Sequence, residues 1–263
     1  MAFSRPAIIG AGIMGEAMIS ALSRVGISGG AITIYEKREE RAKELIDKYG
    51  VTRGSLSECD VALLAVKPQD LEAVLGEIKS ELRQGVLLVS LLAGVKSSRI
   101  EAVLGGGVRV VRVMPNTPIL MGAGMSAISA GANASDSDVA WVVDLLGKSG
   151  ATLVVAEDAM DAVTAVSGSG PAYFFGFVEA MIEGAKKLGL KESDAKLLVT
   201  QTLVGAAKMV AESGKDAGTL RANVTSPNGT TAAALASFDK AKWSEIVYEA
   251  MKAARDRSKE LSD

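Results

Sequence analysis

The first 156 residues alternate between short apolar runs and segments with helical periodicity. A helical stripe runs from Ile13 to Val25, and similar spacing occurs at Asp70–Leu82, Ser97–Leu104 and Asp136–Gly147. Apolar runs typical of strands lie at Ala7–Ile9, Ala31–Tyr35, Val61–Val66, Val86–Leu92, Val108–Val113, Met125–Ser129 and Thr152–Val155. This alternation predicts an α/β fold with a mostly parallel sheet and helices on both of its faces.

The strand pattern ends near Glu157, and only helical patterns follow. They cover Asp158–Val166, Ala172–Leu188, Glu192–Ser213, Thr230–Ser237 and Lys242–Leu261. We therefore expect a sheet domain over residues 1–156 and an all-helical domain over residues 157–263. Phe174, Phe175 and Phe177 point in different directions around one helix. A helix that is apolar on all sides must be covered on all sides, so we expect the helical domain to be buried between subunits of at least a homodimer.

The composition excludes several classes of chemistry. No histidine is present, which rules out a Ser-His-Asp triad, histidine metal ligands and imidazole acid–base catalysis. The single cysteine, Cys59, precedes an apolar run, so we expect a buried residue and no metal site. A net charge of −2 disfavours nucleic acid and anionic membranes as partners. The longest uncharged stretch, Val113–Ser135, is broken by prolines and glycines, and no signal peptide is recognisable at the start, so we expect a cytoplasmic protein.

A glycine motif follows the first predicted strand. Gly10-x-Gly12-x-x-Gly15 leads into a helix, and the second strand ends at Glu36. This arrangement is typical of a dinucleotide-binding Rossmann fold, in which glycines let the backbone approach the pyrophosphate at a helix N-terminus. The cofactor-binding residues predicted here include Ile13 and Met14 together with the three glycines.

The choice between NADH and NADPH stays open at the end of the second strand. The Glu36 carboxylate is placed to accept a hydrogen bond from the ribose 2′-hydroxyl and to repel a 2′-phosphate. Lys37 and Arg38 follow directly and are equally suited to bind that phosphate. We expect NADH to be used well.

Further candidate residues follow the other predicted strands. In a parallel sheet, ligands bind beyond the carboxyl ends of the strands. The segments at these ends contain Ala65, Val66, Lys67, Pro68, Ala93, Met114, Pro115 and Asn116, which we predict to contact the cofactor. Lys67 is also compatible with a simple surface position at a strand end. Asn116 lies between two nearby prolines and is suited to form a hydrogen bond either with a buried amide or with a ribose.

The segment Leu220–Thr231 is rich in turn-forming residues and hydroxyl groups. Pro227 fixes φ, and both Asn228 and Gly229 tolerate left-handed backbone conformations. We expect a tight loop that delivers N–H groups and hydroxyls to a helix N-terminus near Thr230, which would bind a small anion such as a carboxylate. An ordinary capped turn is the alternative.

Five motifs, GAGIMG, AVKP, VMPNTP, DAVTAVSGSGPAY and VTSPNGTT, resemble those of pyrroline-5-carboxylate reductase in order and spacing. The resemblance implies reduction of 1-pyrroline-5-carboxylate to proline by hydride from NADPH or NADH, in homodimers or larger assemblies of dimers. It places the substrate carboxylate on Ser226, Gly229 and Thr230, and the ring nitrogen on Thr231. Asn223 is implied as a cofactor contact. Asn228 stands where the family usually has glycine, and we expect it to adopt the left-handed conformation.

Two other functions are compatible with a glycine motif. The β-hydroxyacid dehydrogenases carry GxGxxxKxxxN at the corresponding helix, but here Phe174 occupies the lysine position and Val178 the asparagine position. A protein that binds NAD(P) without turnover would need no second anion site, and the Leu220–Thr231 segment counts against it. Activity on a six-membered cyclic imine is not excluded.

Overall fold

The computed structural model describes residues 3–105 and 107–261. These residues form two compact units. One comprises the described residues up to Ser169 together with 253–261, and the other is Gly170–Lys252. The expected boundary after residue 156 separates the sheet from the helices that follow it. By spatial contact, however, residues 157–169 and the last turns of the chain group with the sheet, so that boundary stays a prediction.

The sheet unit contains eight strands in the order β3-β2-β1-β4-β5-β6-β7-β8. All neighbouring strands are parallel except β6 and β7, which are antiparallel. Only a short 3-10 helix, Thr117–Met121, connects these two strands, and it is too short for a parallel crossover. The strands are β1 Pro6–Ile9, β2 Thr33–Tyr35, β3 Thr52–Arg53, β4 Val61–Leu64, β5 Leu87–Ser90, β6 Arg109–Met114, β7 Gly124–Ala130 and β8 Gly150–Val154. The predicted mostly parallel Rossmann-type sheet is confirmed.

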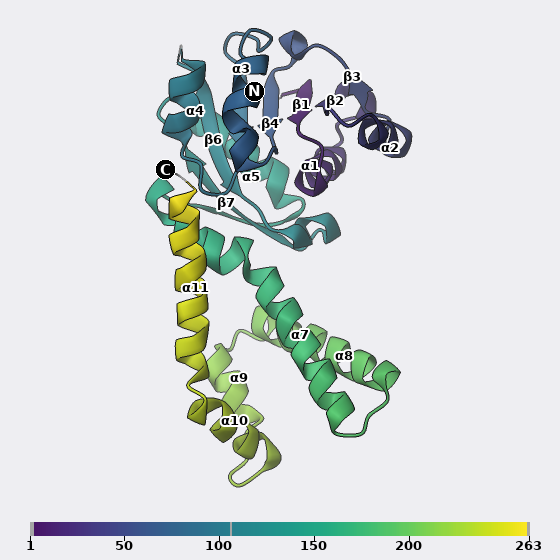
Figure 1. Cartoon of the computed structure of the whole chain (residues 1–263), viewed down its shortest axis with the longest axis vertical. Helices are drawn as coiled ribbons and strands as arrows, with labels where there is room; N and C mark the ends of the chain where they lie inside the picture. The colour runs from purple at the N-terminus through teal and green to yellow at the C-terminus, as the bar shows by residue number, and fades with distance from the viewer. Residues whose placement is uncertain (1–2, 106, 262–263) are drawn as a thin grey trace. The chain divides into compact units, whose positions relative to one another are not determined.

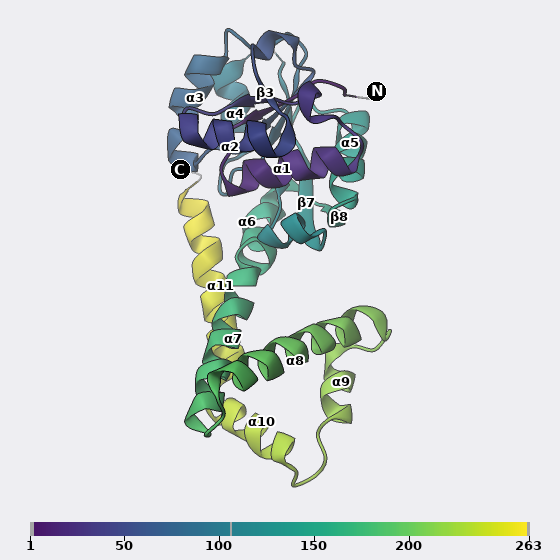
Figure 2. The ribbon, with the colours of Figure 1, turned by 90° about the vertical axis from the view of Figure 1, so that its right-hand side faces the viewer.

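Helices cover both faces of the sheet (Figures 1 and 2). On one face, α1 (Ile13–Arg24), α2 (Glu39–Tyr49) and α5 (Asp136–Gly147) share a buried apolar cluster with alternate strand residues such as Ile8 and Leu63. On the other face, α3 (Leu71–Ile78) and α4 (Ser97–Leu104) pack against the remaining residues, including Ile9 and Leu64. This division follows from the two-residue period of strand side chains.

The chain leaves the sheet through an irregular helical segment. A 3-10 turn at Glu157–Ala159 leads into α6 (Met160–Val163) and a π-helical turn at Thr164–Gly168. The Ser169 N–H donates to the Thr164 carbonyl at 2.8 Å, which is the spacing that defines a π turn. The last turn of the chain returns to this unit, because a Cβ added at Gly94 would lie 2.6 Å from the Ser258 carbonyl oxygen.

The second unit is entirely helical. It contains α7 (Gly170–Lys187), α8 (Glu192–Glu212), α9 (Ala217–Asn223), α10 (Thr230–Lys240) and most of α11 (Trp243–Glu260). The helical hairpin of α7 and α8 is visible in Figure 1. Large apolar side chains lie exposed along these helices in the single chain, among them Phe174 and Phe175, each 61% exposed. This is the pattern expected of helices that are covered by another subunit.

One local prediction was wrong. Leu220–Asn223 is the end of α9 and not part of a loop; Asp216 caps this helix by accepting the Thr219 N–H at 3.0 Å. At the edge of the sheet, Thr52–Arg53 forms β3 and pairs with β2. Among the described residues, no helix is both long and apolar enough to cross a membrane.

Candidate active site

The three glycines of the first motif differ in what surrounds them. Gly10 has φ +84, and a Cβ on it would lie 2.7 Å from Val66 Cγ1. A Cβ on Gly15 would lie 2.3 Å from the Gly10 carbonyl oxygen, so only glycine lets α1 approach the end of β1 so closely. Around Gly12, by contrast, a Cβ would meet nothing within 4 Å. The tight turn and the close helix packing thus belong to Gly10 and Gly15, and Gly12 leaves open the space that a pyrophosphate requires.

A pocket of about 630 Å³ opens beside this loop. It lies where β1 separates β2 from β4, which is the point where strand order reverses and where such folds bind nucleotides. Predicted residues that line it are Gly10, Gly12, Ile13, Glu36, Lys37, Arg38, Ala65, Val66 and Lys67. Ile13 is 70% exposed at the start of α1, whose N-cap Gly12 has no side chain to occupy the first N–H groups. The residues present therefore fit a dinucleotide.

Four lining residues were not predicted, namely Tyr35, Asp70, Ala73 and Val74. Tyr35 is the last residue of β2, directly before Glu36. The other three follow Pro68 at helical spacing, which is the signal that could have identified them. Met14, Gly15, Pro68 and Ala93 do not line this pocket, and their roles stay predictions.

Glu36 is held tightly at the edge of the pocket. Its side chain is only 7% exposed, and its carboxylate accepts hydrogen bonds from the Ala11 N–H at 3.0 Å and the Arg38 N–H at 2.9 Å. The Arg38 guanidinium donates to the same carboxylate at 3.0 and 3.1 Å. Burial by itself raises the pKa of Glu36, but the bonds from Arg38 and Ala11 outweigh it and hold the pKa below its usual value. Glu36 is thus a fixed negative charge.

The neighbouring cations are both paired. Arg38 binds Glu36, and Lys37 Nζ donates to Glu77 Oε1 on α3 at 2.6 Å. The Tyr35 hydroxyl donates to the other oxygen of Glu77 at 3.0 Å. The hydrogen bond to Glu77 is the main cause of the raised pKa of Lys37. The two cations that were candidates for a 2′-phosphate are therefore engaged with carboxylates.

Two motifs far apart in the sequence meet beyond the end of β6. Asn116 Oδ1 accepts the Met125 N–H at 2.9 Å, and its Nδ2 donates to the Ser167 carbonyl in the π turn at 3.3 Å. Gly168 lies so close to Met114 that a Cβ on it would be 2.3 Å from Met114 Cε. Asn116 thus satisfies backbone groups, which is one of the two roles predicted for it. Pro115 lies between Met114 and Asn116 in the chain, and its contact with a cofactor stays a prediction.

The predicted substrate loop lies in the helical unit. The Gly229 N–H donates to the Ser226 carbonyl at 3.1 Å, and Asn228 has φ +57, so Ser226–Gly229 has the features of a type II turn with proline in second position. The expected left-handed conformation of Asn228 is confirmed. Gly229 is the N-cap of α10, and because glycine has no side chain, no capping oxygen competes for the first N–H groups of the helix.

The hydroxyls of this loop lie at the same helix start. Thr230 and Thr231 are the first two residues of α10. Ser226 Oγ would lie 2.4 Å from a Cβ placed on Gly229, so this hydroxyl is directly beside the uncapped N-terminus. Asn223 is the last residue of α9 in the same unit. The arrangement combines backbone N–H donors with two kinds of hydroxyl at one exposed turn, which suits a small carboxylate.

Both parts of the chain are similar to known protein families. Residues 157–261 match the family model for pyrroline-5-carboxylate reductase dimerisation, and residues 5–94 match that for NADP oxidoreductase, coenzyme F420-dependent. Pyrroline-5-carboxylate reductase from Corynebacterium melassecola is 41% identical over 263 residues, covering 97% of this chain and 97% of that protein.

Solved structures of such reductases share the whole fold. The enzyme from Coxiella burnetii has a TM-score of 0.90 at 34% identity and covers 100% of both chains. The enzyme from Plasmodium falciparum, solved with NADP bound, has a TM-score of 0.89 at 31% identity over 98% of both chains. The chain therefore belongs to the pyrroline-5-carboxylate reductase family, the NAD(P)H-dependent oxidoreductases that reduce 1-pyrroline-5-carboxylate to proline.

Proposed function

We propose that the Ser226–Thr231 turn binds the substrate of this reductase. The carboxylate accepts hydrogen bonds from the Thr230 N–H and from the Ser226 hydroxyl, whereas the Gly229 N–H stays bound to the Ser226 carbonyl at 3.1 Å and holds the turn. The Thr231 hydroxyl hydrogen-bonds to the ring nitrogen. The observation that carries this proposal is the glycine N-cap of α10, which leaves helix N–H donors beside Ser226 without a competing side chain.

The nicotinamide cofactor supplies the hydride, and the protein supplies position and charge. A chain without histidine can support this reaction, because the imine nitrogen is itself basic enough to hold a proton or a strong hydrogen bond near neutral pH. Thr231 fixes that nitrogen, and its neighbours fix the carboxylate. Because Pro227 and the Ser226–Gly229 hydrogen bond shape the turn in advance, the separation of these groups does not have to be organised when the substrate arrives.

The cofactor occupies the pocket beside the glycine motif. Its pyrophosphate lies at Gly12 and the start of α1, and Glu36 accepts a hydrogen bond from the ribose 2′-hydroxyl. NADH is used well, because the Glu36 carboxylate is ionised, nearly buried and directly at the pocket edge. Lys67, which lines the same pocket, contacts the cofactor as well.

The helical region, residues 157–263, serves substrate binding and dimerisation. The match of residues 157–261 to a dimerisation family and the exposed apolar side chains of α7 and α8 support a homodimer or a larger assembly built from dimers. We assign the enzyme to the cytoplasm, with neither nucleic acid nor membrane as partner, in keeping with its net charge of −2.

Substitution of Thr231 tests the proposed site. Thr231→Val keeps the shape and one methyl group but removes the hydroxyl, and Thr231→Ser is the matched control that keeps it. Loss of a hydrogen bond to a charged nitrogen is worth about 1.5–3 kcal/mol, so the valine variant should lose about ten- to a hundredfold in kcat/KM, measured by absorbance loss at the nicotinamide band. If the folded valine variant keeps full kcat/KM, Thr231 is only a structural residue in the first turn of α10 and the nitrogen takes its proton from water.

A further inference from the structure

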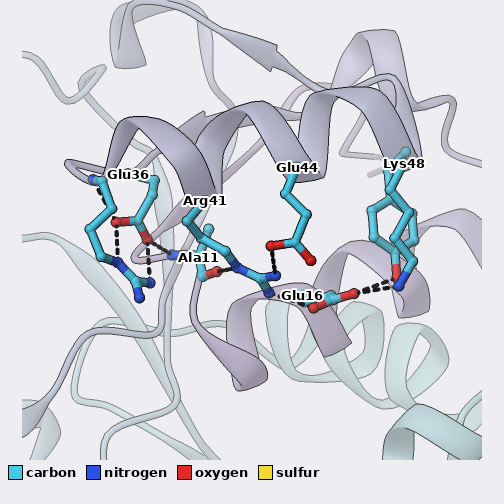
Figure 3. Close-up of polar contacts among 8 residues, drawn as sticks. Ala11, Glu16, Glu36, Arg41, Glu44 and Lys48 are labelled. Atoms are coloured by element: carbon cyan, nitrogen blue, oxygen red, sulfur yellow. Dashed lines mark hydrogen bonds and ion pairs between the residues drawn. The ribbon is translucent and has the colours of Figure 1, made fainter.

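Both backbone groups of Ala11 are bound by side chains from elsewhere in the fold (Figure 3). Its N–H donates to Glu36 Oε2 at 3.0 Å, and its carbonyl accepts from Arg41 Nε at 2.9 Å. Ala11 stands between the first two glycines of the dinucleotide motif. Arg41 lies on α2, thirty positions further along the chain. The pyrophosphate loop is thus fixed by one acidic and one basic side chain.

Arg41 is itself fixed by two carboxylates. Its guanidinium pairs with Glu16 in the first turn of α1 and, at 2.7 Å, with Glu44 on its own helix. Its side chain is 16% exposed, as is that of Glu16. Lys48 Nζ and the Tyr49 hydroxyl donate to the other oxygen of Glu16 at 2.8 and 3.0 Å (Figure 3). The pairs of Arg41 with Glu16 and Glu44 leave its Nε directed at the Ala11 carbonyl.

The hydrogen bond from Arg41 sets the direction of the Gly12 N–H. In a planar trans peptide the carbonyl of one residue and the N–H of the next point in opposite directions. With the Ala11 carbonyl turned toward Arg41, the Gly12 N–H points away from Arg41. Gly12 lines the cofactor pocket, whereas the Ala11 N–H is already occupied by Glu36. Of these two donors, only Gly12 remains for a pyrophosphate oxygen.

Packing holds this peptide on one side only, because Ala11 is fully buried in the apolar cluster but Gly12 is not. A Cβ at Gly12 would meet nothing within 4 Å, and glycine permits a wide range of backbone angles. Rotation of the 11–12 peptide would turn a carbonyl oxygen toward the position of the phosphates. We propose that Arg41 is a positioning residue for cofactor binding, which fixes the Ala11–Gly12 peptide so that the Gly12 N–H faces the pyrophosphate. The proposal rests on the cofactor site proposed above.

Arg41→Met tests this inference, because methionine keeps an unbranched side chain and removes the donor. The KM for NADH and for NADPH should rise about tenfold or more, the loss expected for one hydrogen bond that involves a charged group. The value of kcat and the KM for the imine should stay close to wild type. In Arg41→Lys an ammonium group replaces the forked guanidinium. The KM for each cofactor in this variant should therefore lie between the values of the wild type and of Arg41→Met. Lys48→Met is the matched control: it removes the other cation of Glu16 without touching Ala11, and an exposed pair of this kind changes an equilibrium constant by at most about fivefold.

Competitive inhibitors separate positioning from general loosening. ADP-ribose carries the pyrophosphate, and adenosine does not. In Arg41→Met the inhibition constant of ADP-ribose should rise in parallel with the KM for NADH, and that of adenosine should stay unchanged. Equal weakening of both inhibitors, or an unchanged KM for NADH, would overturn the inference. If wild-type enzyme gives no quench or shift of NADH fluorescence on titration, the proposed cofactor site itself is wrong.

Discussion

Replacement of Glu36 by glutamine should change the cofactor preference more than any other single substitution at the pocket edge. The change removes one negative charge and keeps the size of the side chain. In the wild type this carboxylate is 7% exposed and accepts bonds from the Ala11 N–H and from Arg38. A lowered pKa keeps it ionised at neutral pH. It therefore meets a 2′-phosphate as a fixed like charge and a 2′-hydroxyl as a strong acceptor.

The size of the effect follows from these distances. Two like unit charges about 4 Å apart repel by about 4 kcal/mol at an effective dielectric constant of about 20. The Arg38 guanidinium, 3.0 Å from the carboxylate, cancels part of this repulsion. Loss of a charged acceptor for the 2′-hydroxyl weakens NADH binding by about 1.5–3 kcal/mol in the variant. The ratio of kcat/KM for NADPH to that for NADH should therefore rise about ten- to a hundredfold in Glu36→Gln.

Steady-state kinetics with the imine and each cofactor measure this ratio directly. Glu40→Gln is the control, because it removes the same charge from an exposed position on α2 outside the pocket, and it should leave the ratio within about twofold at physiological salt. An unchanged ratio in Glu36→Gln would refute the reasoning. So would a wild-type kcat/KM for NADPH more than about a hundredfold above that for NADH, since a fixed carboxylate could not allow it.

Other expectations concern the substrate turn, the assembly and pH. Ser226→Ala should raise the KM for the imine with little effect on kcat, because the carboxylate keeps its charge during hydride transfer; a loss confined to kcat would contradict this. Gly229→Ala should behave similarly, since its Cβ would displace the Ser226 hydroxyl, whereas an unchanged KM would separate that hydroxyl from the carboxylate. Light scattering at micromolar concentration should show a molar mass of at least a dimer. A monomer of 27.1 kDa would refute the prediction that another subunit covers the apolar faces of the helical unit. The hydrogen bond from Lys48 is the main cause that lowers the pKa of Glu16 to about 2. Burial opposes this shift, and the hydrogen bonds from Arg41 and Tyr49 add to it. Glu16 therefore contributes on the order of 3 kcal/mol to the free energy of unfolding above pH about 4.5, and this contribution is lost as the pH falls toward 2. In Glu16→Gln the free energy of unfolding should depend less on pH over this range, and an unaltered pH dependence would contradict the lowered pKa.

Features that depend on neighbouring residues could be predicted from the chain alone. The steric need for Gly15 beside Gly10, the acid after the second strand and the left-handed Asn228 all follow from spacing of a few positions. The alternation of strands and helices is of the same kind, because it reflects which side chains share a face. The short helix α9 was not predicted, because the glycines at positions 214 and 218 on either side of its N-cap, Asp216, are typical of a turn.

The tertiary structure alone decided which partners the charged residues take. Lys37, Arg38 and Arg41 lie within one short basic and acidic run, and nothing in that run distinguishes their roles. Folding places Lys37 against a glutamate forty positions away, and Arg41 against the Ala11 carbonyl thirty positions away. The order of strands and the packing of α1, α2 and α3 around them determine these meetings. Hydrophobic periodicity encodes which face of an element is buried, but not which element lies beside it or which side chain it brings within hydrogen-bonding distance.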